Sequence, residues 1–255
     1  MVTEQKDIIA REREFHNARF AQAEDPRKHL DKWYWAIRHG AMQQDALIRR
    51  LATDADLLEY GCSTGGWSLD DLHLPTVCRS LVGIDISDVA VRRAEERARE
   101  LEASNTEFLA MNAEAMTFPD GSFDLVYGRG IIHHLDLVKC YTEVSRVLRP
   151  GGKALFYEPM GHNPLLNAYR SSTPGIRTED EHPLLVSDFE LARHYFAQAD
   201  VRYFGLFSVA SALLPSILRE PAFVLGRTVD SVVLKMPYIG RFSWHALITL
   251  TKRLS

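Results

Sequence analysis

The residues best suited to chemistry form a glycine-rich turn between two apolar runs. The turn reads Glu59-Tyr60-Gly61-Cys62-Ser63-Thr64-Gly65-Gly66, and the second apolar run ends at Asp85. Glycine lets the backbone approach a ligand without a Cβ clash. An acidic residue after the next strand can accept hydrogen bonds from both hydroxyls of a ribose. A core strand alone explains the apolar runs but not these glycines and this carboxylate. The order therefore predicts a site for a nucleoside-bearing cofactor.

The same turn indicates which cofactor. A dinucleotide fingerprint has three glycines in the pattern G-x-G-x-x-G, but Ser63 stands where the middle glycine would be. Glu59 lies at the end of the first strand, where a carboxylate repels a diphosphate and attracts a cationic amino-acid tail. S-adenosylmethionine carries an ammonium, a sulfonium and a ribose, and has no phosphate. The local chemistry favours S-adenosylmethionine.

The elements around the turn alternate between strands and helices. We expect strands near 56–60, 81–85, 106–110, 123–127 and 153–158, with helices between them, including one after Gly66 and one capped by Ser87 or Asp88. Further strands are expected near 201–209 and 242–251. This alternation predicts an α/β fold with a doubly wound, mostly parallel sheet. In such sheets the ligand lies beyond the carboxyl ends of the strands, where the turn and Asp85 fall.

Several sequence blocks resemble the class I S-adenosylmethionine-dependent methyltransferases, and their small-molecule, UbiE-like branch in particular. Besides the glycine turn, they are Asn112-Ala113-Glu114, Phe118 to Val126, Ile131-Ile132-His133-His134-Leu135 and Leu148-Arg149-Pro150-Gly151-Gly152. They stand in the family's order and together cover about residues 55–160. The resemblance implies a Rossmann-like methyltransferase fold with seven strands, an N-terminal helical cap and helical insertions near the C-terminus. Two positions depart from the family pattern: Ser63 replaces a glycine, and Asn112 replaces an aspartate.

The resemblance also implies a set of cofactor contacts. Glu59, Gly61, Ser63 and Gly65 would frame the methionine and ribose, and Asp85 would bind the ribose hydroxyls. Ile86, Asn112, Ala113 and Glu114 would border the adenine, while Gly128 and Arg129 would lie on the sulfonium side.

Three histidines are candidates for a general base. His133 and His134 follow the fourth strand, where the resemblance implies the substrate side of the cleft, and His162 lies in a later connection. An oxygen or carbon nucleophile must lose a proton, and a histidine titrates in the suitable range. Because neighbouring helical residues point about 100° apart, we expect only one of His133 and His134 to face the methyl group.

The acceptor site is expected outside the shared blocks. Residues 1–52 would form an N-terminal helical arm and cap, and 53–255 the methyltransferase domain, with lid-like insertions at about 160–186 and 210–241. Trp33, Tyr34 and Trp35 either contact the substrate or pack the cap onto the sheet. The first insertion either covers the substrate or is a solvated loop. The candidate substrate-binding residues are Tyr34, Glu158, Tyr169, Arg170, Arg177 and His182.

The apolar insertion at 210–241, expected as two helices, has several possible roles. Extra core or a dimer contact is the simplest, and cover for a greasy substrate or a peripheral membrane contact are the others. Its few basic residues make strong binding to anionic lipid the weaker alternative. The N-terminal arm is a second segment through which a homo-oligomer could form.

Composition narrows the class of protein. The chain has 255 residues and a net charge of −4, which argues against a nucleic-acid partner. Its three cysteines show no metal-binding spacing, so no metal is expected. The charged first fourteen residues are not typical of a signal peptide, and no apolar run reaches the length of a membrane span. We therefore expect a cytoplasmic protein.

The interpretation that these patterns favour is a methyltransferase acting on a small, partly apolar metabolite by O- or C-methylation, and releasing S-adenosylhomocysteine. The acceptor could be a natural product, a quinone, an isoprenoid or a lipid-like molecule. One alternative is a non-catalytic S-adenosylmethionine-binding subunit, and a third interpretation is a nicotinamide-dependent oxidoreductase.

Overall fold

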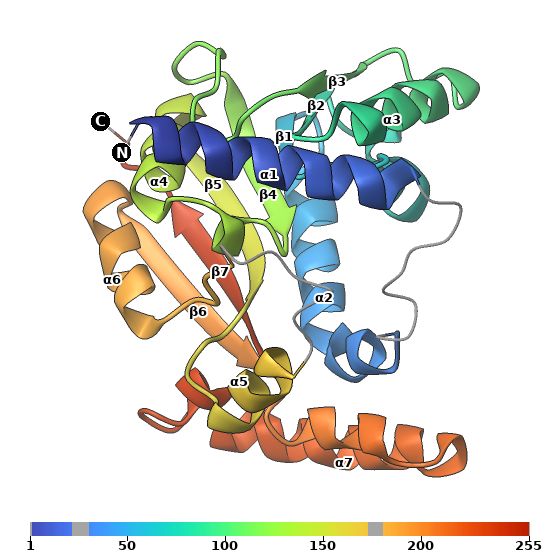
Figure 1. Cartoon of the computed structure of the whole chain (residues 1–255), viewed down its shortest axis with the longest axis vertical. Coiled ribbons are helices and arrows are strands. Elements are labelled where there is room, and N and C mark those ends of the chain that lie inside the picture. The colour runs from blue at the N-terminus through green and yellow to red at the C-terminus, as the bar shows by residue number, and fades with distance from the viewer. Residues whose placement is uncertain (1, 22–30, 173–180, 255) are drawn as a thin grey trace.

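Seven strands form one mixed sheet at the centre of the molecule (Figure 1). The computed structural model describes residues 2–21, 31–172 and 181–254. The strands are β1 (Asp56–Tyr60), β2 (Ser80–Asp85), β3 (Thr106–Ala110), β4 (Phe123–Arg129), β5 (Leu148–Pro159), β6 (Gln198–Phe204) and β7 (His245–Thr251). Their order is β3-β2-β1-β4-β5-β7-β6, and β7 alone runs antiparallel to its neighbours β5 and β6. This confirms the predicted fold class.

Helices surround the sheet. The α-helices are α1 (Val2–Ala21), α2 (Asp31–Leu51), α3 (Asp88–Glu100), α4 (Leu137–Val147), α5 (Pro164–Ser171), α6 (Val186–Tyr195) and α7 (Ser216–Val233). Shorter turns are the π-helix η2 (Trp67–Asp71) and the 3-10 helices η3 (Leu74–Thr76), η4 (Ile132–His134), η6 (Ser208–Leu213) and η7 (Gly240–Phe242).

Both faces of the sheet are buried, because successive residues of a strand point to opposite sides. In β1, Leu57 packs in the cluster that includes side chains of α2 and α3, and Leu58 packs in the cluster that includes α4 and α6. Leu125 and Val126 of β4 divide in the same way. The sequences of the central strands are therefore nearly continuous apolar runs, and their polar residues lie mostly at the strand ends.

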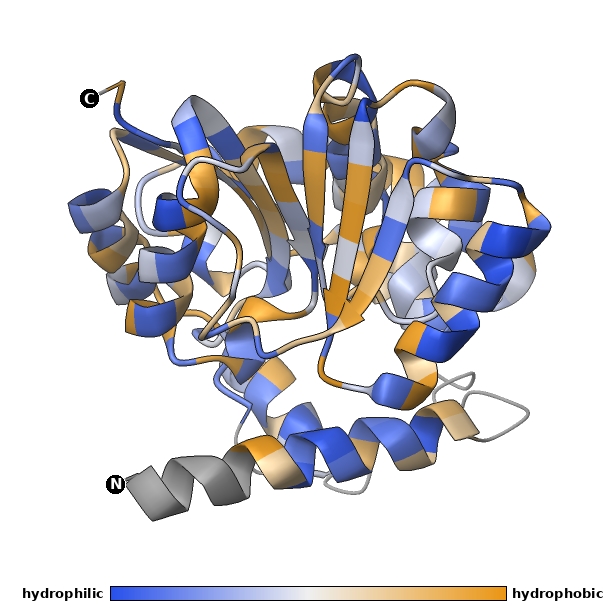
Figure 2. Ribbon diagram, turned by 90° about the horizontal axis from the view of Figure 1, so that it is seen from above, coloured by the Kyte–Doolittle hydropathy of each residue, from blue (hydrophilic) through white to orange (hydrophobic). Residues whose placement is uncertain are grey.

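The chain changes direction between β1 and β4, which are neighbours in the sheet. From β1 the chain winds outward through β2 and β3, and then returns to β4 on the other side. Loops that leave the carboxyl ends of β1 and β4 diverge at this point and leave a crevice between them. Figures 1 and 2 show α1 lying crosswise over this edge of the sheet.

Two polar side chains fix the N-terminal helices to the rest of the domain. Gln44 of α2 is fully buried, and its Nε2 donates to the carbonyl oxygens of Gly128 at 2.8 Å and Leu155 at 3.2 Å. Asn17 of α1 accepts a hydrogen bond from the Ser87 hydroxyl at 2.6 Å and donates to Asp88 at 2.8 Å. Hydrogen bonds thus join α2 to the sheet and α1 to the start of α3.

Several element boundaries differ from the prediction. The helix expected after Gly66 is only the π-turn η2, and β6 ends at Phe204 instead of continuing to residue 209. The first insertion contains helix α5, with Pro164 in its first turn and Asn163 as its N-cap. Of the two helices expected in the second insertion, one is α7, and the other helical segments there are the short 3-10 turns η6 and η7. Helix α7 exposes most of its apolar side chains instead of adding to the core. Within the described ranges, we find no helix with the length and apolar content to cross a membrane.

Candidate active site

A cavity of about 660 Å³ lies at the carboxyl ends of the parallel strands. One end is formed by the turn after β1, the end of β2 and the loop after β3. The other end is formed by the segment after β4, the end of β5, helix α5 and the start of β7. Helices α1 and α2 line it from the N-terminal side. The volume is in the range of small-molecule sites.

The glycine turn takes an unusual backbone shape. Gly61, Ser63 and Gly65 have φ angles of 67°, 51° and 77°, in the left-handed region that favours glycine. Ser63 is the non-glycine member, and its N–H donates to Asp85 Oδ2 at 2.9 Å. The other oxygen of Asp85 accepts the N–H of Ser87 at 2.9 Å. Both oxygens of Asp85 thus face backbone donors, and the residue lines the cavity.

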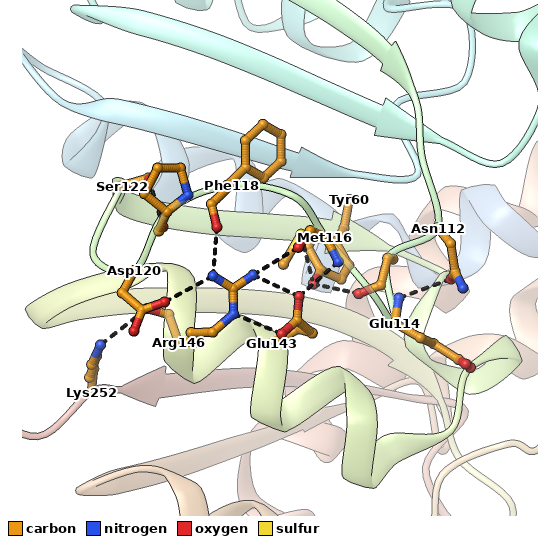
Figure 3. Close-up of polar contacts among 12 residues, drawn as sticks. Tyr60, Asn112, Glu114, Met116, Phe118, Asp120, Ser122, Glu143, Arg146 and Lys252 are labelled. Atoms are coloured by element: carbon orange, nitrogen blue, oxygen red, sulfur yellow. Dashed lines mark hydrogen bonds and ion pairs between the residues drawn. The ribbon is translucent and has the colours of Figure 1, made fainter.

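The loop after β3 is held by an arginine from α4 (Figure 3). Arg146 donates to the carbonyl oxygens of Met116 at 3.0 Å and Phe118 at 2.6 Å, and pairs with Glu143 at 2.8 Å. The hydroxyl of Tyr60 donates to the carbonyl of Ala113 at 3.1 Å. These bonds fix the loop that carries the expected adenine contacts, and Asn112, Ala113 and Glu114 all line the cavity.

His133 lies at the other end of the cavity with one ring nitrogen already bonded. Its Nδ1 is 2.7 Å from Oε2 of Glu158, a residue with no exposed surface. A carboxylate can only accept, so we assign the imidazole proton to Nδ1, which leaves Nε2 as an acceptor. Burial and the neighbouring His134 lower the pKa of His133, although Glu158 opposes them. His133 is therefore neutral at pH 7 and able to take a proton.

His134 has the opposite electrostatics. Burial disfavours its charged form, but Glu12 of α1, whose Oε2 is 3.7 Å from Nδ1, acts together with Glu181 and Glu158 to raise the pKa of His134. The rings of His133 and His134 are 4.2 Å apart and both line the cavity. Both rings thus face one cavity, and the expectation that only one of the pair faces the methyl group stays a prediction. The short turn η4, with His133 and His134 at its last two positions, brings both rings to one side.

Among the described residues, the group with donor atoms close enough to share a metal ion is His133, His134 and Glu181. One ligand atom from each lies within 4.8 Å of the others. Glu181 Oε1 is 4.0 Å from His134 Nε2, so an ion pair accounts for part of this closeness. The sequence indicated no metal, and that remains a prediction.

Aromatic rings wall the same end of the cavity. Trp33 of α2 packs against Tyr169 of α5 at 5.6 Å and against Trp244 at 5.3 Å between ring centroids. Tyr157 of β5 stacks on His245 of β7 at 4.8 Å. All five line the cavity. Of these only Tyr169 was among the predicted site residues, because the others stand in no pattern that separates a site residue from a core residue.

Two further predicted substrate residues also reach the cavity. Tyr34 and Arg170 line it, and Arg170 donates to the carbonyl of Met160 at 2.8 Å. The lining also includes Ile9, Glu12, His16, Arg19 and Phe20 of α1, which the sequence interpretation did not assign to the site. The charged, weakly periodic sequence of α1 gave no sign of this role.

Arg129 lines the cavity but is held by α2. Its Nε donates to Gln44 Oε1 at 2.9 Å, and one Nη donates to Asp45 at 2.6 Å. The guanidinium also lies 4.3 Å from the ring centre of Trp67. Arg129 therefore helps to fix α2 beside β4. Besides Arg129 and the residues described above, Gly61, Ser63 and Ile86 are predicted cofactor residues that line the cavity.

Glu59 is placed differently from the prediction. Its side chain is buried, accepts a hydrogen bond from Ser68, and does not line the cavity. The Ser68 hydroxyl in turn lies 2.7 Å from that of Tyr127. Burial raises the pKa of Glu59 to about 8. The carboxyl group is thus neutral at pH 7, and the expected attraction of a carboxylate for a cationic tail is corrected.

Other predicted residues also lie outside the cavity lining. Gly65 packs against Leu69 and Ala94, and Gly128 packs against Tyr60 and Ile131. Both glycines therefore allow close packing of the backbone, and neither lines the cavity. Glu158 lies behind His133. His162 Nε2 accepts the N–H of Val186 at 3.0 Å, and His182 is exposed beside Asp188. Neither His162 nor His182 lines the cavity. Arg177 lies outside the described residues.

Comparison with known proteins agrees with this geometry. Residues 58–156, which contain the turn, Asp85 and the histidine pair, match the family model described as a methyltransferase domain. Residues 58–156 therefore carry a methyltransferase domain. The matched region ends within β5, so α1, α2 and everything after β5 lie outside it.

Similar proteins act on small molecules, as their names state. The chain is 32% identical over 121 residues to a demethylmenaquinone methyltransferase of Lactococcus lactis, which covers 47% of each protein. It is 31% identical over 167 residues to the sterol 24-C-methyltransferase erg6 of Aspergillus fumigatus, which covers 64% of this chain and 40% of that protein. The chain thus spans about half the length of the curated relatives it matches.

Solved structures share the fold of the methyltransferase domain. A geranyl diphosphate C-methyltransferase from Streptomyces coelicolor, solved with S-adenosylhomocysteine, has a TM-score of 0.59 and 15% identity, and covers 83% of this chain and 78% of that one. A phosphoethanolamine N-methyltransferase 2 from Haemonchus contortus, solved with S-adenosyl-L-methionine, has a TM-score of 0.60 and 17% identity, and covers 93% of this chain and 60% of that one.

The buried Glu59 generates a stability prediction. Its pKa of about 8 in the folded protein exceeds the ordinary value of 4.5. Between these pH values the folded chain keeps a proton that the unfolded chain has released, so the free energy of unfolding falls as pH rises through the window. In Glu59→Gln, which has no proton to lose here, the free energy of unfolding should fall less steeply with pH, by about 1.4 kcal/mol per pH unit.

Urea unfolding between pH 5 and pH 8 measures this slope. The exposed Glu107→Gln is the control, and its slope should match that of the unchanged protein. Calorimetry should show cofactor affinity of Glu59→Gln within about twofold of normal at pH 7, since the neutral carboxyl and the amide are alike in charge. A tenfold loss would restore the expected role of Glu59 in cofactor binding.

Proposed function

We propose that this chain transfers the methyl group of S-adenosylmethionine to a small, partly apolar acceptor. The observation that carries the proposal is the continuity of one cavity, which joins the Asp85 carboxylate to the neutral imidazole of His133. A cofactor held at one end would meet an acceptor held at the other. The similar demethylmenaquinone and sterol methyltransferases support an apolar acceptor, and so do the aromatic rings at the His133 end.

The residues present fit the cofactor. Asp85 offers carboxylate lone pairs to a ribose, and the Ser63 and Ser87 amides hold its oxygens in place. A Cβ on Gly61 would lie 3.2 Å from the Ile131 side chain, so glycine allows the turn to pack closely against Ile131 at the cavity. We propose that Asp85, Ile86, Asn112, Ala113 and Glu114 bind the nucleoside.

Positioning and proton removal are the tasks left to the chain. When bound, S-adenosylmethionine supplies a methyl group on a cationic sulfur. Helices α1 and α2 line the cavity. Well-oriented reactants can gain up to about 7–11 kcal/mol from positioning alone. We propose that His133 Nε2 accepts the proton of the acceptor hydroxyl or C–H while the Glu158 carboxylate holds Nδ1–H.

Asp85→Ala tests the nucleoside site. Loss of about two charge-assisted hydrogen bonds should weaken S-adenosylmethionine binding by about tenfold or more. Calorimetry measures the affinity, and the exposed carboxylate variant Asp200→Ala is the matched control, expected to bind normally. Unchanged affinity in Asp85→Ala would rule out the ribose assignment.

His133 and Glu158 are tested by pH profiles with an apolar phenol or quinol acceptor and mass spectrometry of the product. Because the pKa of His133 is lowered, kcat/KM should rise with pH through a value below 6.5 and then level off. His133→Asn should lower kcat by about 100-fold or more and leave cofactor affinity unchanged.

Glu158 is a positioning residue in this proposal, and its conservative variant separates that role from a structural one. Glu158 raises the pKa of His133, so Glu158→Gln should move the acid limb to lower pH as well as reduce kcat. A variant with lower kcat and an unmoved limb would contradict the role of Glu158. Full activity in His133→Asn would show that the base lies elsewhere or is not needed.

A further inference from the structure

Helix α7 turns its apolar side chains toward solvent. Ile217, Leu225 and Val232 are 84%, 67% and 66% exposed, whereas Asp230 on the other side of the helix is buried. A surface helix of a globular protein has the reverse arrangement, with apolar residues inward and charges outward. Leu213 and Tyr238, on the segments before and after the helix, are also more than two-thirds exposed. We call these five side chains the α7 face, which lies at one end of the molecule (Figure 1).

The orientation of α7 is fixed, so this face cannot turn inward. The buried carboxylate of Asp230 accepts hydrogen bonds from the N–H of Phe207 at 2.8 Å and from the N–H and hydroxyl of Ser208 at 3.1 and 2.7 Å. Gly226 packs so closely that a Cβ there would lie 2.7 Å from Ser208 Cα. Rotation of the helix would break these bonds and leave the donors of the buried Ser208 without their acceptor, which is costly.

Few basic residues lie near the α7 face, but both acidic residues there are paired or buried, so the remaining charge is positive and favours an anionic partner after all. Between residues 206 and 241 the chain has four basic residues (Arg219, Arg227, Lys235 and Arg241) and two acidic ones (Glu220 and Asp230). Glu220 is paired with Arg38 at 2.8 Å, and Asp230 is buried. Arg227 is exposed on α7, and Lys235 is exposed just after its end. In a two-fold dimer formed through this face, equivalent basic residues would be brought toward each other, which is unfavourable.

The side of α7 away from the α7 face contacts a residue that lines the cavity. The guanidinium of Arg38 lies 3.7 Å from the ring centre of Phe223 in α7 and pairs with Glu220 of the same helix. Arg38 and its neighbour Tyr34 line the acceptor end of the cavity. One side of α7 therefore contacts a cavity-lining residue while the opposite side faces outward.

We propose that the α7 face lies on an anionic lipid bilayer, at the boundary of headgroups and acyl chains, and that the apolar acceptor enters the cavity from that surface. Apolar side chains flanked by Lys and Arg on one exposed helix are the features that bind this boundary. The entry of the acceptor rests on the proposed function, whereas the contact with the bilayer does not.

Vesicle co-sedimentation of the full chain tests the contact. We use phosphatidylcholine vesicles with and without phosphatidylglycerol, and expect binding that is stronger to the anionic vesicles. Ile217→Ser/Leu225→Ser/Val232→Ser should reduce binding by about tenfold or more, because it removes the apolar contact. The matched control is Val77→Ser/Leu101→Ser/Val138→Ser, three exposed apolar side chains elsewhere, which should bind within about twofold of the unchanged chain.

A second variant does not depend on the apolar substitutions being tolerated. Arg227→Gln/Lys235→Gln should lower binding to anionic vesicles and leave binding to neutral ones unchanged. Cofactor affinity, measured by calorimetry, confirms that each variant is folded. Vesicle binding with no methyl transfer to any acceptor would contradict the proposed function and leave the bilayer contact standing.

Two results would overturn the inference. One is a vesicle result: the unchanged chain fails to bind anionic vesicles, or the triple α7 variant binds them equally well. The other is a light-scattering result without lipid. If the unchanged chain is a dimer and the triple α7 variant is a monomer, with vesicle binding unaltered, the α7 face would be assigned to a second copy of this chain.

Discussion

The carboxylate of Asp85 is the group on which the geometry of the site depends. It accepts the N–H of Ser63 in a left-handed turn and the N–H of Ser87 at the start of α3. Ser87 caps α3 through Ala90 and donates to Asn17 of α1. A single charge at the end of β2 therefore connects the glycine turn, the first helix after the strand and the helix that covers the cavity. A non-glycine residue in the left-handed region costs free energy, and these bonds help to offset that cost.

A second buried carboxylate organises the other end of the cavity. Glu158 accepts the N–H groups of Ile131 and Ile132 and bonds His133. The turn η4 and the imidazole are thereby fixed by the same side chain. Burying Glu158 without such donors would be unfavourable. The position of His133 is thus a consequence of satisfying Glu158, and the lowered pKa of His133 results from the burial that this arrangement requires.

Features that the backbone determines could be predicted from the sequence. The direction in which a side chain points could not be predicted where two directions were equally compatible with the pattern. Strand positions could be predicted from apolar runs and turn residues, and β3 was predicted with its observed bounds. The placement of Asp85 in the cavity could be predicted from its position at the end of β2. Glu59 stands just as plausibly at the end of β1, but successive residues of a strand point to opposite faces, and Glu59 bonds Ser68 away from the cavity. The role of α1 could not be predicted, because its contacts with the site depend on Asn17 meeting Ser87 across 70 residues.

The two ends of the cavity are built by different means, and this explains what similar proteins can share. The nucleoside end is made of a backbone turn, a capped loop and one carboxylate, all within residues 58–156. Such a site tolerates many side chains as long as the turn keeps its shape. The acceptor end takes Trp33 from α2, Tyr169 from α5 and Trp244 from the segment before β7, all outside the matched region. Its shape is set by side chains on elements that carry no shared pattern, so it can change without altering the nucleoside end. The acceptor should therefore differ among proteins that keep the same cofactor, and the aromatic rings that line this end of the cavity are the residues to vary when acceptor choice is studied.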